Sequence, residues 1–518
     1  NRLSAYDLVR SEWEKAVFPR QSAEWKFDDF WNRSLQAGFA VVLPGKESRT
    51  LFNFSALESS LVGVSTKGDD GALRVLLYPS MTMLDGRHAH NPWLHELPDP
   101  VTKIVWDNFA SVSPAMAKRL GTDEGDVIQI AMDNVAALEL PVHIQTGQVD
   151  GVVAVPLGYG RKGTDRFTNV GPAWLQARPT VEPGELVGKN AAKLLCFSNG
   201  LLAYDGQVSV KTTGRKHTLA ATQEYNFLRE PNLLGQQTEE RRPIIQEATL
   251  AAYLSNPAAG SSPKPDLDSM WPDDHKYAGH HWGMAVDLTA CTGCSACLVG
   301  CQAENNIPVV GKDEVRRSRE MTWIRIDRYY DEQDGKLSVS HQPMMCQQCG
   351  NAPCETVCPV LATVHSDEGL NQQIYNRCVG TRYCANNCPY KVRHFNWFQY
   401  PRGDAMHKMV LNPDVTVRDR GVMEKCSFCS QRIQLAKIEA KREGRELKDG
   451  DIQPACAQSC PAHAIVFGDM NDPKSAVSQQ MKDQRYYRVL EEIGVQPSVG
   501  YLTLIHDRVK KEEDAHHG

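Results

Sequence analysis

The sequence predicts an α+β protein of several domains, with a β-rich region ahead of a cysteine-rich one. Its 518 residues exceed what a single hydrophobic core usually serves. From about Val101, short β-like runs are separated by Gly, Asp and Pro residues. Fifteen of the 16 cysteines stand in four compact groups, the first of which begins at Cys291. These observations indicate a β domain followed by a metal-binding domain.

The composition excludes several classes of function. Hydrophobic residues make up 41% and charged residues 23% of the chain, which is ordinary for a globular protein. The formal net charge of −6 offers no basic field for a nucleic-acid partner. No segment approaches the roughly 18 uninterrupted apolar residues that span a bilayer. If the protein works at a membrane, another subunit must therefore provide the anchor.

The first residues predict an amphipathic helix. Apolar side chains recur at helical spacing after Ser4, for example at Val9 and Trp13, and Pro19 ends the pattern. The sequence begins at Asn1 with neither an initiator methionine nor a signal-peptide pattern. We therefore expect this helix to pack on material that precedes it in a longer protein.

The β-rich region begins with a predicted helix, turn and strand over residues 113–130. Alternating apolar residues predict the next strand over 138–144, and a glycine-flanked apolar run follows at 151–160. This order resembles the C-terminal dinucleotide-binding domain of the molybdopterin oxidoreductases, which implies a six-stranded double-psi β-barrel over residues 101–230. Residues 1–100 would then be the tail of a molybdopterin oxidoreductase-like α/β region.

In that family the barrel helps to hold the guanine nucleotide of the cofactor. Asn169, Asn190 and Gln223 are possible counterparts of the residues that do so, but polar loop residues are mostly turn formers. We therefore do not expect these residues to bind a nucleotide.

The rest of the chain divides into three parts. Residues 231–280 lose periodicity and are rich in turn formers from Ser255 onward, so they predict a linker that wraps over a domain surface. Residues 281–470 hold the four cysteine groups. Residues 471–518 form a C-terminal extension that ends in a polar tail.

The cysteine groups have the spacing of bacterial ferredoxins. The first group is Cys291, Cys294, Cys297 and Cys301; the second is Cys346, Cys349, Cys354 and Cys358; the third is Cys378, Cys384 and Cys388; the fourth is Cys426, Cys429, Cys456 and Cys460. Closely spaced thiolates can hold three corners of one cubane, while the last cysteine of the run reaches a different cluster. The pattern therefore predicts a four-cluster, tandem ferredoxin-like iron–sulfur domain.

A proline follows the last cysteine of three groups, at Pro359, Pro389 and Pro461, whereas Gln302 follows the first group. Because proline has a preset φ and suits the first turn of a helix, we expect a helix to start at each of these cysteines.

Two other interpretations of the cysteines are less favoured. Structural zinc usually takes two cysteine pairs per metal, and a disulfide framework belongs to small secreted domains. The remaining cysteine, Cys196, sits alone in an apolar stretch, so we expect it in a hydrophobic core.

Four segments around the cysteines, at 282–291, 303–308, 345–349 and 424–429, resemble the electron-transfer subunits of the DMSO and polysulfide reductase type. The resemblance implies how the groups pair. It gives three four-thiolate sets: Cys291, Cys294 and Cys297 with Cys460; Cys426, Cys429 and Cys456 with Cys301; and Cys346, Cys349 and Cys354 with Cys388. Cys358, Cys378 and Cys384 remain for the last cluster.

This last set contains only three thiolates because Thr381 stands where the family has a cysteine. A threonine hydroxyl stays protonated near neutral pH and is a poor iron ligand beside three sulfurs. We therefore expect one [3Fe-4S] cluster here and [4Fe-4S] clusters in the other three sets. The alternative is a [4Fe-4S] cluster whose fourth iron carries water or the Thr381 oxygen.

Several charged or titratable residues lie near the cysteine groups in the sequence. They are the basic residues Lys391, Arg393, Lys425 and Arg432 and the histidines His365 and His394. The basic residues could tune cluster potentials, but we interpret them as ordinary solvated or paired charges. We interpret the two histidines as structural.

The joined order of the two regions is similar to the large iron–sulfur subunit of alternative complex III, a quinol-oxidising respiratory complex. The resemblance implies electron transfer from quinol, with the [3Fe-4S] cluster first, towards c-type haems, and no catalytic acid, base or nucleophile on this chain. It also implies that the molybdopterin oxidoreductase-like part is a retained fold with a lost or unused nucleotide site and no molybdopterin. The implied partners are a polysulfide-reductase-type integral membrane subunit that binds quinol, c-type cytochrome subunits and a terminal oxidase. The implied location is the periplasmic face of the inner membrane, as a peripheral subunit. The alternative is the electron-transfer part of an active molybdenum reductase, such as polysulfide or tetrathionate reductase.

Overall fold

The computed structural model describes residues 4–44, 54, 72–132, 135–164, 181, 184–198, 201–225, 244–263, 271–272, 275–333, 336–400 and 408–507. They belong to two compact units, 1–70 and 71–518. Asn169 and the tail from residue 508 lie outside the described residues. In the described part of the chain, no helix combines the length and the apolar character needed to cross a membrane.

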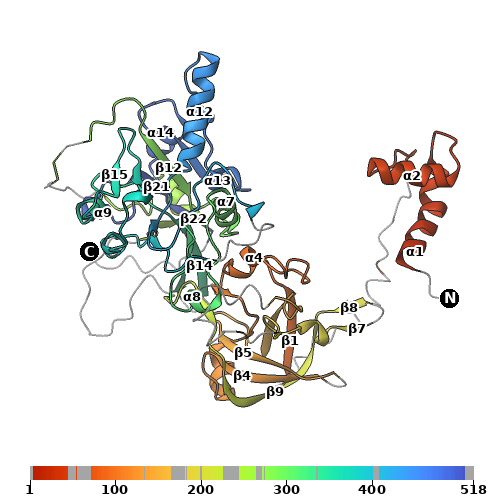
Figure 1. Cartoon of the computed structure of the whole chain (residues 1–518). Coiled ribbons are helices and arrows are strands. Elements are labelled where there is room, and N and C mark those ends of the chain that lie inside the picture. Colours follow the sequence, from red (N-terminus) through yellow and green to blue (C-terminus); the bar gives the residue numbers. More distant parts are fainter. Residues whose placement is uncertain are drawn as a thin grey trace. The chain divides into compact units, whose positions relative to one another are not determined.

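The first unit contains two helices, α1 at Ala5–Glu12 and α2 at Phe27–Ala37 (Figure 1). Ser4 caps α1 in a capping box with Asp7, so the helix starts where the sequence predicts. The helix continues as a π-turn and a 3₁₀ turn that contains Pro19. Phe30 and Trp31 of α2 are buried against aromatic side chains that precede them.

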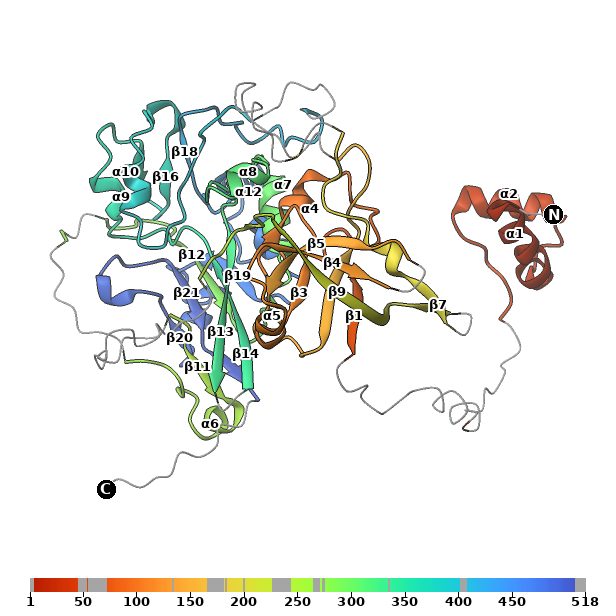
Figure 2. The ribbon, with the colours of Figure 1, turned by 90° about the horizontal axis from the view of Figure 1, so that it is seen from below.

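Six strands of the second unit close into a barrel with the order β1-β6-β3-β5-β4-β9 (Figures 1 and 2). They are β1 (Leu73–Pro79), β3 (Ala110–Val112), β4 (Asp126–Ala131), β5 (Leu138–Ile144), β6 (Val152–Leu157) and β9 (Asp205–Lys216). The pairs β1–β6 and β3–β5 are parallel, and the other neighbours are antiparallel. The interior is filled by apolar side chains such as Val75, Ile128 and Val142, all fully buried.

The predicted helix, turn and strand appear as α5 (Pro114–Leu120) and β4, and the next two predicted strands appear as β5 and β6. The barrel also takes β1 from before residue 101, where the sequence had placed its start. The β1 segment is apolar almost throughout, so its periodicity does not distinguish a strand from a helix.

Smaller elements surround the barrel. They are α4 (Pro92–Glu96), β2 (Ile104–Val105) paired with β10 (Ala220–Ala221), the 3₁₀ helix Ala191–Leu194, and the hairpin of β7 (Cys196–Ser198) with β8 (Leu201–Ala203). Cys196 is half-buried in this hairpin, so the prediction of a core position is wrong. The reason is that β7 pairs with β8 and is not a barrel strand.

The cysteine-rich region is built on a four-stranded sheet with the order β19-β12-β21-β20. Its strands are β12 (Trp282–Asp287), β19 (Ile465–Asp469), β20 (Tyr486–Tyr487) and β21 (Val499–Leu502). The C-terminal extension therefore supplies two strands of this sheet. The expected linker supplies β11 (Glu247–Thr249), which pairs with β22 (Leu504–His506), and α6 (Leu250–Ser255).

Helices, and the loops and small sheets beside them, make up the rest of the cysteine-rich region. The helices are α7 (Ala296–Glu304), α9 (Pro353–Thr356), α10 (Tyr383–Asn386), α12 (Ser430–Glu443) and α13 (Ala455–Gln458), with α8 (Lys312–Val315) and α14 (Ala476–Met481) beside them. The two-stranded sheets are β13 (Arg325–Gln333) with β14 (Lys336–Met344), β15 (Thr363–His365) with β16 (Asn371–Gln373), and β17 (His394–Phe395) with β18 (Met423–Glu424). Figure 2 shows the β13–β14 hairpin alongside the barrel.

Buried polar contacts join the barrel region to the cysteine-rich region. The Lys312 ammonium lies 2.5 Å from the Asp107 carboxylate, and both side chains are buried. The Glu96 carboxylate accepts hydrogen bonds from the backbone N–H groups of Val310 and Gly311. Gln223 exchanges two hydrogen bonds with the backbone of Arg328. Gln223 therefore has a structural role here.

Candidate iron–sulfur sites

The same turn follows the last cysteine of three groups. In each, a short helix ends, the Cys-Pro pair follows, and the third residue after the cysteine adopts a positive φ; these residues are Leu361, Lys391 and His463. The turn brings a backbone N–H back to the thiol: Ala362 donates to Cys358 Sγ at 3.2 Å and Ala464 to Cys460 Sγ at 3.3 Å. The proline therefore belongs to a sulfur-binding turn. The prediction that it starts a helix is wrong, because the helix lies before it.

The first group departs from this turn because α7 continues past Cys301 to Glu304. The side chain of Asn305 replaces the missing backbone donor: its Nδ2 lies 3.5 Å from Cys301 Sγ and 3.8 Å from Cys429 Sγ. Asn305 thus joins two cysteines that are far apart in the sequence. Its role could not be read from the spacing of the cysteines.

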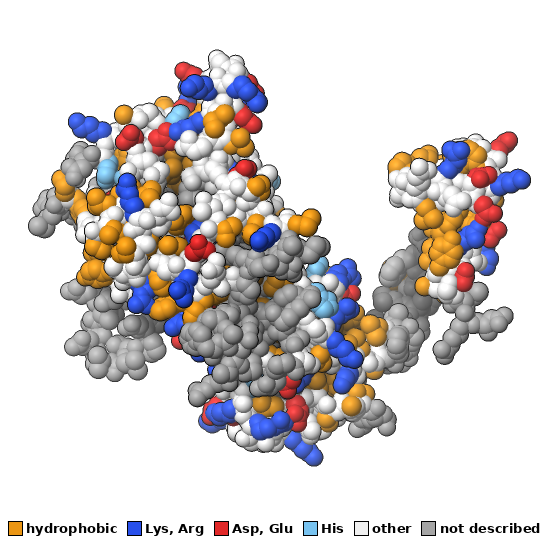
Figure 3. Space-filling model, in the orientation of Figure 1, with side chains coloured by type: hydrophobic (Ala, Val, Ile, Leu, Met, Phe, Trp, Pro, Cys, Tyr) orange, Lys and Arg blue, Asp and Glu red, His pale blue; other side chains and the backbone are white. Residues whose placement is uncertain are grey.

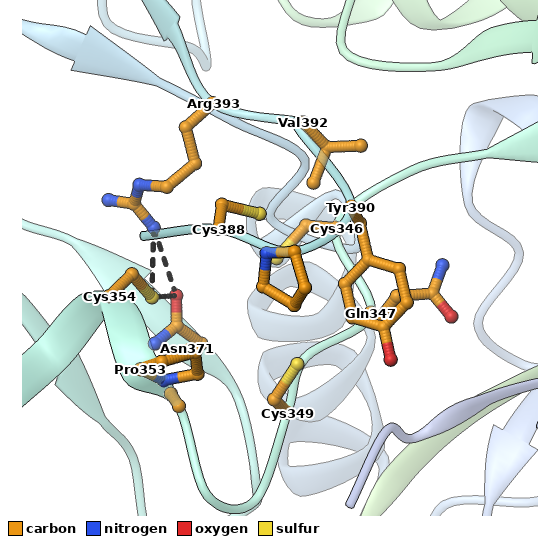
Figure 4. A pocket seen from close by; sticks show the side chains of 12 residues that line it. Cys346, Gln347, Cys349, Pro353, Cys354, Asn371, Cys388, Tyr390, Val392 and Arg393 are labelled. Atoms are coloured by element: carbon orange, nitrogen blue, oxygen red, sulfur yellow. Dashed lines mark hydrogen bonds between the residues drawn. The ribbon is translucent and has the colours of Figure 1, made fainter. Parts of the chain in front are cut away.

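The set of Cys346, Cys349, Cys354 and Cys388 lines one apolar cavity (Figure 4). Other lining residues include Tyr390, Val392 and Arg393. Burial raises the pKa of Cys354, and the Arg393 charge lowers it by a smaller amount, so that the pKa is raised to about 12. All four thiols are buried.

The set of Cys301, Cys426, Cys429 and Cys456 is also fully buried. Burial, and then the thiols of the other three cysteines, raise the pKa of Cys301 well above its ordinary value. Phe428 N–H donates to Cys426 Sγ and Ala455 N–H to Cys429 Sγ. The structure thus brings the last cysteine of the first group to three cysteines of the fourth.

The set of Cys291, Cys294, Cys297 and Cys460 lies nearer the surface, since Cys294 is exposed and two others are half-buried. Burial, and then the thiols of Cys291, Cys294 and Cys460, raise the pKa of Cys297. The structure therefore also brings these four together.

The three-cysteine set lies at the surface on α9, α10 and the loops beside them. Cys358 and Cys378 are half-buried, Cys384 is buried, and Thr381 is exposed. Asn387 Nδ2 donates to the Pro353 carbonyl at 2.6 Å, which ties the two helices together. Burial raises the pKa of Cys358, but the N–H groups of its turn outweigh burial and leave the pKa lowered.

These sets suit iron–sulfur clusters on chemical grounds. Thiols packed together away from water resist ionisation, so buried thiolates need a bound cation as compensation. Backbone N–H groups directed at sulfur are the contacts that stabilise cluster thiolates. The sets therefore offer both the sulfur ligands and the hydrogen-bond donors that a cluster requires.

The four sets follow one another in a row. Burial and neighbouring thiols, Cys297 among them, raise the pKa of Cys456, so the Cys291 set adjoins the Cys301 set. The Cys346 thiol likewise helps to raise the pKa of Cys426, so the Cys301 set adjoins the Cys346 set. Arg393 lies beside both Cys354 and Cys384, so the three-cysteine set comes last. The two outer sets reach the surface, and the two inner sets are buried.

Both histidines contact other residues of the fold. His394 Nδ1 lies 2.8 Å from the Glu320 carbonyl oxygen, and burial lowers the pKa of His394 to about 4. The His365 ring pairs with Glu355 at 2.5 Å and stacks on His275 with ring centroids 4.4 Å apart. Because the two rings stack, their in-plane lone pairs do not converge on one point, so His275, Glu355 and His365 form a poor metal site as they stand.

Comparison with known proteins agrees with this domain. A model of the 4Fe-4S dicluster domain family matches residues 290–362. The iron–sulfur cluster-binding subunit of menaquinone reductase from Nitratidesulfovibrio vulgaris is 44% identical over 230 residues, which are 43% of this chain and 88% of that protein. A polysulfide reductase subunit from Wolinella succinogenes is 31% identical over 42% of this chain and 92% of its own length. The protein belongs to this family of iron–sulfur electron-transfer subunits.

Among solved structures, acetylene hydratase from Pelobacter acetylenicus aligns with 35% of this chain and 23% of its own length, at 15% identity and a TM-score of 0.20. A likeness this weak does not establish a shared fold for the barrel. The 4Fe-4S domain follows from the family match, whereas the ligand sets rest on the cysteine positions described above.

Proposed function

We propose that this chain is the electron-transfer subunit of a membrane-bound, quinol-oxidising respiratory complex of the alternative complex III type. In this proposal the sets of Cys291, Cys301 and Cys346 each bind a [4Fe-4S] cluster, and Cys358, Cys378 and Cys384 bind a [3Fe-4S] cluster. Bound clusters supply one-electron transfer. The chain itself supplies ligands, spacing and burial.

The observation that carries the proposal is the row of four sets with surface sets at both ends. Two buried inner sets are shielded from solvent, and each outer set can be approached by a partner. Such an arrangement suits a protein that receives electrons at one end and delivers them at the other. The family supports it, because its members include subunits named for menaquinone reductase and polysulfide reductase.

The three-cysteine end has the surface of a docking site. Leu361, Val379 and Tyr383, which flank its cysteines, are 62%, 66% and 55% exposed. In Figure 3, hydrophobic side chains gather over the part of the surface where α9 lies in Figure 1. Exposed apolar patches mark protein or membrane contacts. We assign this end to the quinol-binding integral membrane subunit and the Cys291 end to c-type cytochrome subunits, on the periplasmic face of the inner membrane.

The six-stranded barrel is consistent with a double-psi barrel of molybdopterin dinucleotide-binding type, and we propose that it holds no molybdopterin. Of the residues that could contact such a nucleotide, Asn190 caps the helix Ala191–Leu194 and Gln223 bonds Arg328. Their polar groups are thus already engaged in the fold.

The test is reduction by quinol in the complex purified from its native membrane. Added quinol should abolish the EPR signal of an oxidised three-iron cluster, and metal analysis should find haem iron but no molybdenum. Molybdenum near one atom per chain would replace the proposal by the electron-transfer part of a molybdenum reductase. A three-iron signal that persists after quinol is added would contradict the assignment of the three-cysteine set to the end that receives electrons from quinol.

A further inference from the structure

Two buried cations lie at the junctions between neighbouring cysteine sets. Arg393 is 6% exposed and Lys425 is 1% exposed. The sequence suggested ordinary solvated or paired charges at four basic positions. Arg432 fits that description, because it pairs with Glu304 at 2.7 Å. For Arg393 and Lys425 the prediction is wrong.

Arg393 lies between the Cys346 set and the three-cysteine set. Its guanidinium donates to Cys354 Sγ at 3.4 Å and to Asn371 Oδ1 at 3.4 Å (Figure 4). Cys384, from the three-cysteine set, lies beside the same guanidinium. The other amino group donates to Thr363 Oγ1 at 2.7 Å and to Gln373, so polar neighbours fix the position of the charge.

Lys425 lies between the two inner sets. Its ammonium donates to the Cys426 carbonyl oxygen at 2.9 Å. Its charge acts on both Cys354 of one set and Cys426 of the other. One cation thus stands at each of two consecutive junctions.

Among the described residues, neither cation has a carboxylate within 4.0 Å, the limit for an ion pair. The buried Arg418 nearby does have one, Glu424 at 2.7 Å. A further buried cation, Lys103, lies near Cys291 with Asp99 and Asp327 in its surroundings. A buried charge without a counter-charge is strongly destabilising, and thiolate-bound clusters at the neighbouring sets would supply the anionic partners of Arg393 and Lys425.

We propose that the buried positive charges of Arg393 and Lys425 raise the reduction potentials of the clusters on either side of them. A cation favours the reduced cluster because reduction adds negative charge. Arg393 acts on the three-cysteine set and the Cys346 set, and Lys425 acts on the Cys346 and Cys301 sets. The inference rests on the ligand sets of the proposed function and is independent of the direction of electron flow.

The experiment is a potentiometric titration of the full chain followed by low-temperature EPR. The variants are Arg393→Gln and Lys425→Gln, which remove a charge, with Arg393→Lys and Lys425→Arg as matched controls that keep it. Iron content is measured in every sample, so that loss of a cluster is separated from a change in its potential. The Cys291 set touches neither cation and serves as an internal reference.

Arg393→Gln should reduce the equilibrium constant for reduction of the three-iron cluster about tenfold, a fall of about 59 mV for one electron. Lys425→Gln should leave the reduction potential of the three-iron cluster unchanged. It should lower the equilibrium constants for reduction of the two four-iron clusters, those of the Cys346 and Cys301 sets, by a similar factor. The charge-keeping controls should shift each potential by less than half as much. If Arg393→Gln loses iron, the test rests on Lys425→Gln and its control Lys425→Arg. The charge-removing variant should then lower the potentials of the two neighbouring clusters, and the control should shift them by less than half as much.

Unchanged potentials in the charge-removing variants, at full iron content, would overturn the inference. So would equal shifts of all clusters in both variants. If the oxidised wild-type chain showed no three-iron signal, the proposed ligand set at Thr381 would be wrong instead. The shifts of the four-iron clusters would still test the two cations in that case.

Discussion

Replacing Thr381 by cysteine should turn the three-iron site into a four-iron site. The residue lies between Cys378 and Cys384, and it occupies the one ligand position of the family pattern that lacks a thiol. Its side chain is exposed, so a thiol of similar size meets no packed core. The variant therefore changes the ligand set with little change in the fold.

The size of the effect follows from these facts. An exposed substitution away from caps and cores shifts the free energy of unfolding by roughly 0.5 kcal/mol or less. The three-iron EPR signal of the oxidised chain should fall from about one spin per chain to near zero, and the iron content should rise by about one atom. The new four-iron cluster should have a lower midpoint potential than the three-iron cluster it replaces.

The assay is EPR of oxidised and dithionite-reduced samples with iron analysis. Thr381→Ser is the matched control, because a hydroxyl is retained, and it should keep the three-iron signal. If Thr381→Cys kept the full three-iron signal, or if Thr381→Ser abolished it, the role assigned to the missing thiol at this position would be refuted.

Three further outcomes are expected. Lys312→Met should lower the free energy of unfolding by about 3 kcal/mol in chemical denaturation, because it removes the ammonium that neutralises the buried Asp107 carboxylate and leaves the His217 ring, 3.1 Å away, beside it. Adding Asp107→Asn should recover most of the loss. Burial raises the pKa of Glu96 to about 7, above its ordinary 4.5, so the fold favours the protonated side chain. The resulting contribution to the free energy of unfolding is present at low pH and is lost as the pH rises through 7. Between pH 5 and 8 the wild-type chain should therefore lose roughly 2 kcal/mol more than Glu96→Gln, and equal pH profiles would contradict this. Cys196→Ser should leave iron and sulfide content unchanged, whereas loss of iron would make Cys196 a ligand.

The sequence predicts well where local chemistry decides the structure. Ser4, with Asp7 at the third helical position, is enough to start α1, and the alternation over 138–144 is enough for β5. The spacing of the cysteines gives the ferredoxin-like domain, and the expected partners, such as Cys301 with Cys429, lie together. The helix start, the strand and the cysteine spacing are each contained in a short segment, whereas the pairing of distant cysteines is implied only by the family resemblance.

The sequence predicts poorly where distant segments meet. The Cys-Pro pair is compatible with a helix start, and only the return of an N–H to the sulfur selects the turn seen at Cys358. The burial of Arg393 depends on β15 and β16, which come from another part of the chain. Nothing local to Arg393 distinguishes it from Arg432, whose partner Glu304 is also remote in sequence.

The proposed function depends above all on four clusters in this chain, one of them with three irons. The decisive measurement is a count of iron and acid-labile sulfide on the oxidised full chain, together with its EPR spectrum. We expect about 15 iron atoms per chain and a single three-iron signal of about one spin. Zinc in place of iron, or a fully loaded oxidised sample without that signal, would contradict the proposal.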